Sequence, residues 1–164
     1  MSKGFGSGSS KKKRNVKELY LDKQFAEGKK YYLVKNYFKA ELIFLNLKDS
    51  GYVDPNLFLY LADIYISKGS EEKALKFLKR ALEMKPEDPE IYFNLGTIYF
   101  MRNEYEISIS YYLQGINYDS KNAFAYSNLA GCYEEILDYR NAVDCYKKAF
   151  FLNKNLLQIR EKLI

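Results

Sequence analysis

The sequence predicts an all-α solenoid in which helical hairpins stack one on the next. Tyrosines recur at intervals of 34 residues, and each interval holds two amphipathic segments separated by turn residues. The recurring tyrosines are Tyr31, Tyr65, Tyr99 and Tyr133. Because a single hairpin cannot bury its own apolar face, we expect the stability of the chain to come from stacking between neighbouring repeats.

The repeat is clearest in residues 55–88, where large and small residues alternate at helical spacing. Small residues let two helices approach closely, and large ones fill the space between neighbours. The repeating positions are occupied by Phe58, Leu61, Ala62, Tyr65, Ala74, Leu78, Ala81 and Pro86. This pattern resembles the tetratricopeptide repeat (TPR) family, which implies a right-handed superhelical solenoid of helix-turn-helix units.

Three further units are in register with this one. Residues 89–122 and 123–156 keep every marker except the closing proline. Residues 21–54 form a degenerate unit, which has Gln24 and Glu27 where apolar residues are expected. An atypical first repeat with one polar face suits a capping role.

The helix boundaries follow from capping residues and from residues that tolerate unusual backbone angles. We expect helices at 17–34, 37–49, 55–68, 71–84, 89–102, 105–118, 123–136 and 139–152. Polar residues stand where six of the seven helices after the first should be capped, and prolines follow two of them. The expected caps are Asn36, Asp54, Ser70, Asp88, Asn122 and Asp138. Gly69 and Asn103 fall where first helices end, and both tolerate a left-handed conformation.

The two ends of the chain differ from the repeats. Residues 1–17 are rich in Gly and Ser and then basic, so we expect a flexible tail. Its cluster Lys11, Lys12, Lys13 and Arg14 suits either a solvated tail or weak binding of an anionic partner. Residues 155–164 are apolar at helical spacing, which predicts a short capping helix that either leaves an edge for self-association or continues a longer array.

The composition argues against an enzyme. The chain has no histidine, which removes the usual general base and the usual metal ligand, and no nucleophile or phosphate-binding motif is present. We therefore expect no catalytic residue, cofactor, metal or small-molecule substrate. The acidic pairs Glu71-Glu72 and Glu134-Glu135 are interpreted as solvated helix faces. Cys132 and Cys145 are interpreted as small buried thiols in a reducing, cytoplasmic compartment, with a redox pair as the alternative.

The resemblance to the TPR family also implies a binding site. In that family the first helix of each unit lines a concave groove. An asparagine amide has both a donor and an acceptor, so it can hold a peptide backbone whatever the peptide's side chains are. The predicted peptide-binding residues are Tyr60, Asp63, Asn94, Thr97 and Asn128. The alternative is that the asparagines only bond neighbouring helices of the chain itself.

Two features refine the kind of ligand that we expect. The cations with which chaperone-binding members of the family hold a C-terminal carboxylate are missing, and only Asn94 fits that arrangement. In three successive repeats the resemblance places apolar residues toward the groove, namely Phe25, Leu59 and Phe93, and, seven residues after each, Tyr32, Ile66 and Phe100. They suit either an apolar floor for an amphipathic segment or ordinary helix packing.

The sequence is therefore interpreted as a non-enzymatic adaptor that binds a peptide or helical segment of a partner protein. One alternative is the substrate-recognition part of a larger or neighbouring transferase system. Another is a nucleic-acid or membrane-surface binder that acts through the basic tail.

Overall fold

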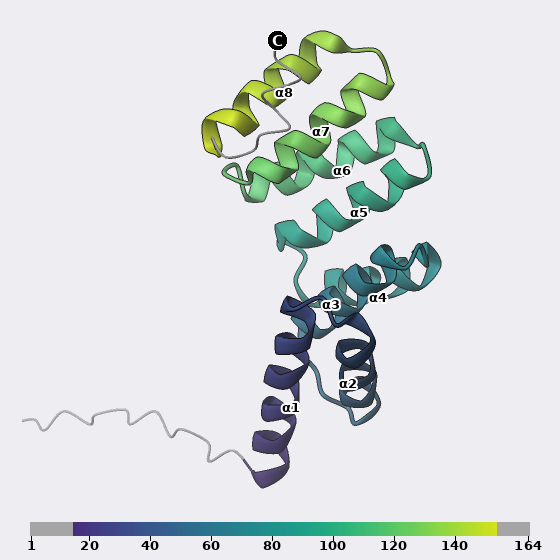
Figure 1. The fold of residues 1–164 in the computed structure, drawn as a ribbon, viewed down its shortest axis with the longest axis vertical. Helices are drawn as coiled ribbons and strands as arrows, with labels where there is room; N and C mark the ends of the chain where they lie inside the picture. The colour runs from purple at the N-terminus through teal and green to yellow at the C-terminus, as the bar shows by residue number, and fades with distance from the viewer. Residues whose placement is uncertain (1–14, 154–164) are drawn as a thin grey trace, which may run out of the picture. The chain divides into compact units, whose positions relative to one another are not determined.

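The computed structural model describes residues 15–153, and these residues form helices joined by short turns (Figure 1). The described helices are α1 (Val16–Leu33), α2 (Tyr37–Asp49), α3 (Pro55–Ser67), α4 (Glu71–Met84), α5 (Pro89–Met101), α6 (Tyr105–Tyr118), α7 (Ala123–Glu135) and α8 (Tyr139–Leu152). Each begins and ends within one residue of its predicted position. The predicted all-α fold is confirmed.

Most of the predicted basic tail, with its Lys11–Arg14 cluster, lies outside the described residues. The predicted capping helix at 155–164, and the edge predicted there for self-association, lie outside them as well. The tail was predicted to extend to residue 17, but α1 already begins at Val16. Asn15 and Glu18 explain the difference, because each side chain accepts a hydrogen bond from the other residue's backbone N–H, at 2.8 Å and 3.1 Å. This capping box fixes the start of the helix.

Five of the six predicted caps are present, and the prediction for Ser70 is wrong. Side-chain oxygens of Asn36, Asp54, Asp88, Asn122 and Asp138 accept hydrogen bonds from backbone N–H groups of the first turn. Ser70 has nearly the same backbone angles as Asn36 but makes no side-chain cap. Serine is among the preferred N-cap residues, but the Ser70 hydroxyl makes no hydrogen bond to the first turn.

The turn within each hairpin contains one residue in the left-handed conformation. Gly69 and Asn103 have φ angles of 66° and 59°, as predicted. Lys35 and Leu137 occupy the equivalent positions of the other two hairpins, with φ angles of 57° and 63°. Because these four residues are 34 positions apart, the backbone itself repeats with the period of the sequence, even where a bulky residue occupies the strained position.

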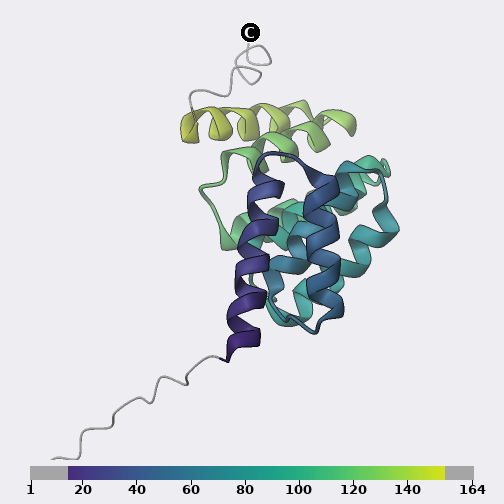
Figure 2. The same ribbon diagram turned by 60° about the horizontal axis from the view of Figure 1, so that its bottom comes forward.

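Contacts along the chain divide it into two units, residues 1–52 and 53–164. In the first unit α1 and α2 pack side by side (Figure 1, Figure 2). Gly28 lies against the Phe44 ring, where a Cβ atom would be 2.5 Å from Cε1. The Phe25 ring packs between Phe44 and Tyr52, with centroid distances of 5.9 Å and 5.4 Å. Phe25 therefore belongs to the core of this hairpin.

The second unit contains three hairpins, α3–α4, α5–α6 and α7–α8, and neighbouring hairpins are in contact. The small residues of the repeat are buried where two helices cross, as the pattern predicts. They are Ala62, Ala74, Ala81, Gly96, Ser108, Gly115, Ala130, Ala142 and Ala149. Gly115 lies against the Phe93 ring and Gly96 against the Tyr112 ring. The large residues thus fill the spaces that the small ones leave.

Candidate functional site

One line of side chains stays accessible on each first helix of the second unit. On α5 the residues Ile91, Tyr92, Phe93, Leu95, Gly96 and Ile98 are buried. Glu90, Asn94, Thr97 and Met101 are exposed or half-buried and follow one another at spacings of four, three and four residues. Such residues lie in a row along one side of a helix.

The same row occurs on α3 and α7. It is formed by Asn56, Tyr60, Asp63 and Ser67 on α3, and by Phe124, Asn128, Gly131 and Glu135 on α7. Since α5 contacts both α3 and α7, the three rows lie next to one another. We call these twelve residues the first-helix face. It contains all five predicted site residues, Tyr60, Asp63, Asn94, Thr97 and Asn128.

Two of the predicted site residues, Thr97 and Asn128, also bond a side chain of the protein itself. The Thr97 hydroxyl donates to the Phe93 carbonyl at 3.0 Å and lies 2.9 Å from the Tyr112 hydroxyl. Asn128 makes a hydrogen bond to the same hydroxyl of Tyr112. Because Tyr112 belongs to α6, these bonds join α5, α6 and α7. A peptide that binds at Asn128 would compete with Tyr112 for its amide.

Tyr112 is almost completely shielded from solvent. Tyr112 is 2% exposed, and burial raises the pKa of its hydroxyl to about 12. Hydrogen bonds from Thr97 and Asn128 favour the ionised form and oppose this rise, but burial outweighs them. At neutral pH Tyr112 is therefore a neutral group that holds three helices together.

Asn94 differs from Asn128. Its residue is half-buried, and its amide has no hydrogen-bond partner among residues 15–153. No side-chain nitrogen or oxygen in this described part is both buried and unpaired, so the polar atoms of Asn94 are open to solvent. Asn94 therefore offers a donor and an acceptor at the centre of the first-helix face.

Glu90 lies one turn before Asn94 in the same row. Its residue is exposed, yet surrounding protein atoms desolvate the carboxyl, which raises its pKa above the usual value. The carboxylates of Asp88, Asp119 and Asp63 raise it further by repulsion. This end of the face is therefore crowded with negative charge.

The apolar residues near the site form the core of the repeats rather than an apolar floor. Leu59 is 9% exposed and Phe93 is 7% exposed. The Phe93 ring packs in a cluster with Tyr112, Leu129 and Cys132. Of the two interpretations left open by the sequence, helix packing is correct for these residues, because their side chains lie between helices and not on the accessible row.

Carboxylates of both acidic pairs bond side chains of other helices or turns, which the sequence did not suggest. Arg102 Nε lies 2.6 Å from Glu71 and its terminal nitrogen 2.6 Å from Glu72, so the end of α5 is tied to the start of α4. The Tyr146 hydroxyl donates to Glu134. The interpretation as fully solvated helix faces is therefore wrong for Glu71 and Glu134. The sequence carried no signal for it, because the partners lie 31 and 12 residues away.

Cys132 is a buried thiol as expected, whereas Cys145 is half-buried. Both are free, and Cys132 is fully buried with its Sγ 3.2 Å from the Ser108 hydroxyl. Burial raises the pKa of the Cys132 thiol, and burial together with Asp144 raises that of Cys145 to about 11. Neither thiol is activated as a nucleophile. Residues 15–153 contain no group of side chains arranged to hold a metal ion and no helix long and apolar enough to cross a membrane.

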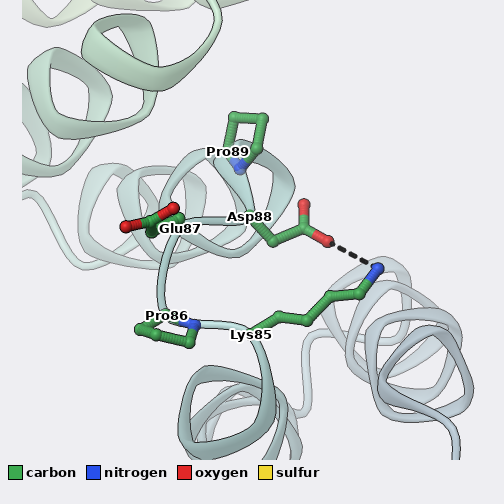
Figure 3. Close-up of a pocket in the computed structure, with 5 residues that line it drawn as sticks. All are labelled: Lys85, Pro86, Glu87, Asp88 and Pro89. Carbon is green, nitrogen blue, oxygen red and sulfur yellow. Dashed lines mark ion pairs between the residues drawn. The ribbon is translucent and has the colours of Figure 1, made fainter.

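A hollow of about 480 Å³ lies at the turn between α4 and α5 (Figure 3). It is lined by Lys85, Pro86, Glu87, Asp88 and Pro89. Asp88 accepts a hydrogen bond from the Glu90 N–H at 3.2 Å and lies 3.6 Å from the Lys85 ammonium. The Pro86 carbonyl accepts from the Tyr92 hydroxyl at 2.5 Å. The polar groups that line the hollow thus bond one another or Tyr92 and hold the turn together. We therefore favour the first-helix face over this hollow as the binding site.

Comparisons with known proteins agree with the repeat pattern. A family model described as TPR repeat matches residues 62–101, and one described as tetratricopeptide repeat matches residues 89–122. No curated protein matches the sequence.

Several solved structures have a similar fold. A structure of a MamA mutant gives a TM-score of 0.72 at 17% identity and covers 90% of this chain and 86% of that chain. A crystal structure of MamA gives a TM-score of 0.71 at 20% identity and covers 83% of this chain and 80% of that chain. A crystal structure of YrrB, described as a TPR protein with an unusual peptide-binding site, gives a TM-score of 0.70 at 20% identity. It covers 84% of this chain and 71% of that chain. The two family models and the 34-residue register of the hairpins thus identify tetratricopeptide repeats within residues 62–122 of the chain.

Proposed function

We propose that the protein is an interaction adaptor that binds an extended peptide of a partner protein on its first-helix face. The observation that carries the proposal is the half-buried Asn94 amide, which is unpaired within the described residues and stands at the centre of that face. A peptide backbone presents one donor and one acceptor per residue, and an asparagine amide matches both.

The surroundings of Asn94 support this role. The rest of α5 is held rigidly by buried contacts, so little side-chain or backbone freedom would be lost when a peptide binds. Tyr60 on α3 and Phe124 on α7, which is 63% exposed, add aromatic surface on either side. Exposed aromatic residues of this kind are typical of protein interfaces. The similarity to YrrB, a protein described by its peptide-binding site, favours the same class of ligand.

Replacing Asn94 with alanine should weaken partner binding about tenfold. The change removes two neutral hydrogen bonds, each worth roughly 0.5–1.5 kcal/mol, and leaves the fold intact because the amide has no partner within the described residues. The measurement is the amount of protein retained from the native lysate by immobilised full-length chain, for the wild type and Asn94→Ala.

The matched control is Asn117→Ala, since Asn117 is an exposed asparagine on α6, away from the first-helix face. The control should retain as much partner as the wild type. Equal loss in both variants, or no loss in Asn94→Ala, would show that the ligand binds elsewhere.

A further inference from the structure

The first helices of the second unit lack cations, whereas two of its second helices carry several. The first helices α3, α5 and α7 contain no lysine or arginine. Their carboxylates are Asp63, Glu90, Glu134 and Glu135. The second helices α4 and α8 carry the cations Lys73, Lys76, Lys79, Arg80, Arg140, Lys147 and Lys148. The first-helix face is therefore negative, while the sequence as a whole has a formal charge of +5.

The negative charge on this face is not balanced by a cation of the same helices. Desolvation raises the pKa of the Tyr105 hydroxyl and the nearby Glu135 raises it further, but this hydroxyl is uncharged at neutral pH and donates to Asn103. Asp63, Asp88 and Asp119 surround Glu90 closely enough to raise the pKa of its carboxyl by repulsion. Arg102, which follows α5, is held by Glu71 and Glu72 of α4. A ligand that supplies cations would relieve this repulsion.

We propose that the occupant of the first-helix face is an extended peptide that carries lysine or arginine side chains, an inference that rests on the proposed function. The argument is charge complementarity: an acidic face without cations attracts a basic segment and rejects an acidic one. The Asn94 amide holds the peptide backbone, and the carboxylates of Glu90 and Glu135 pair with the cations on either side of it.

The spacing of the helices sets the spacing of the cations. Packed helices lie about 10 Å apart, and an extended chain advances about 3.3 Å per residue. A peptide that crosses from α5 to α7 therefore presents matching side chains about every third residue. Glu90 begins its row on α5 and Glu135 ends its row on α7, so about 16 Å along the helix axis adds to this spacing, and the cations that pair with both lie further apart along the peptide.

The test measures binding of two labelled peptides, (Gly-Ser-Lys)4 and (Gly-Ser-Glu)4, to the full-length chain at low salt by fluorescence anisotropy. The lysine peptide should bind and the glutamate peptide should not. The double variant Glu90→Gln/Glu135→Gln should weaken binding of the lysine peptide about fourfold, since each exposed ion pair contributes roughly a factor of two.

The control variant is Glu104→Gln/Glu106→Gln, which removes two exposed carboxylates at the start of α6. It changes the net charge equally, so it should leave the affinity close to that of the wild type. Equal weakening in both variants would show nonspecific attraction and overturn the inference, as would absence of binding by the lysine peptide. If both peptides bind alike and both lose affinity in Asn94→Ala, the proposed function stands and the inference is wrong.

Discussion

Replacing Gly115 with alanine should lower the free energy of unfolding by about 2 kcal/mol. A Cβ atom at this position would lie 2.4 Å from Cε1 and 2.6 Å from Cδ1 of Phe93. The ring cannot retreat, because it packs against Tyr112, Leu129 and Cys132. Overpacking a well-packed core costs about 1–3 kcal/mol, which exceeds the gain of up to about 1 kcal/mol that alanine brings to a helix.

Gly131→Ala is the matched control, because a Cβ atom there would lie 3.9 Å from Cε2 of Phe100, an ordinary contact. It should stabilise the protein by up to about 1 kcal/mol through helix propensity alone. Urea unfolding followed by helical circular dichroism measures both variants. A Gly115→Ala protein as stable as the wild type would contradict the close packing of α5 on α6.

Stability should fall steeply above pH 10, and Tyr112 should account for much of the loss. Its pKa is raised from 10.0 to about 12 in the folded protein, so the neutral form is favoured by folding. The contribution is fully present below the unfolded pKa near 10 and is lost as the pH rises through the folded pKa near 12. Two pKa units correspond to roughly 2.7 kcal/mol.

Tyr112→Phe tests this assignment. The variant should be about 1 kcal/mol less stable at pH 8, because it loses the hydrogen bonds to Thr97 and Asn128. It should also lose less stability than the wild type between pH 8 and pH 11.5. A smaller slope should remain, since burial raises the pKa of other tyrosines as well, namely Tyr92, Tyr111, Tyr126 and Tyr133.

Urea unfolding at a series of pH values gives the comparison. Tyr139→Phe, which changes a tyrosine that is 61% exposed, should keep the wild-type profile. If Tyr112→Phe and the wild type lose stability in parallel up to pH 11.5, the Tyr112 hydroxyl is not the group that couples the fold to alkaline pH.

The fold could be predicted from the sequence because its determinants are local or periodic. Capping residues such as Asp54 and Asp88 act on the next turn, and Gly115 fits Phe93 at the spacing that the repeat requires. Ser70 is the exception, since its residue type is right for a cap but its hydroxyl makes no hydrogen bond to the first turn.

The site could be predicted only in part. Helical spacing places Tyr60, Asp63 and Asn94 on one face, and the structure has them there. The engagement of Asn128 and Thr97 by Tyr112 could not be foreseen, because it depends on side-chain distances across three helices. The same holds for the unpaired state of Asn94 within the described residues, which distinguishes it from Asn128.

The central claim is that the first-helix face holds the ligand, and site-specific photo-crosslinking tests it most directly. A photoreactive phenylalanine analogue would replace Tyr60 or Phe124 on that face, or Ile107 on α6, which is 42% exposed. In the native lysate, a crosslinked partner should appear with the analogue at position 60 or 124 and be absent with it at position 107. Crosslinking from position 107 alone would place the partner on the second helices and contradict the account.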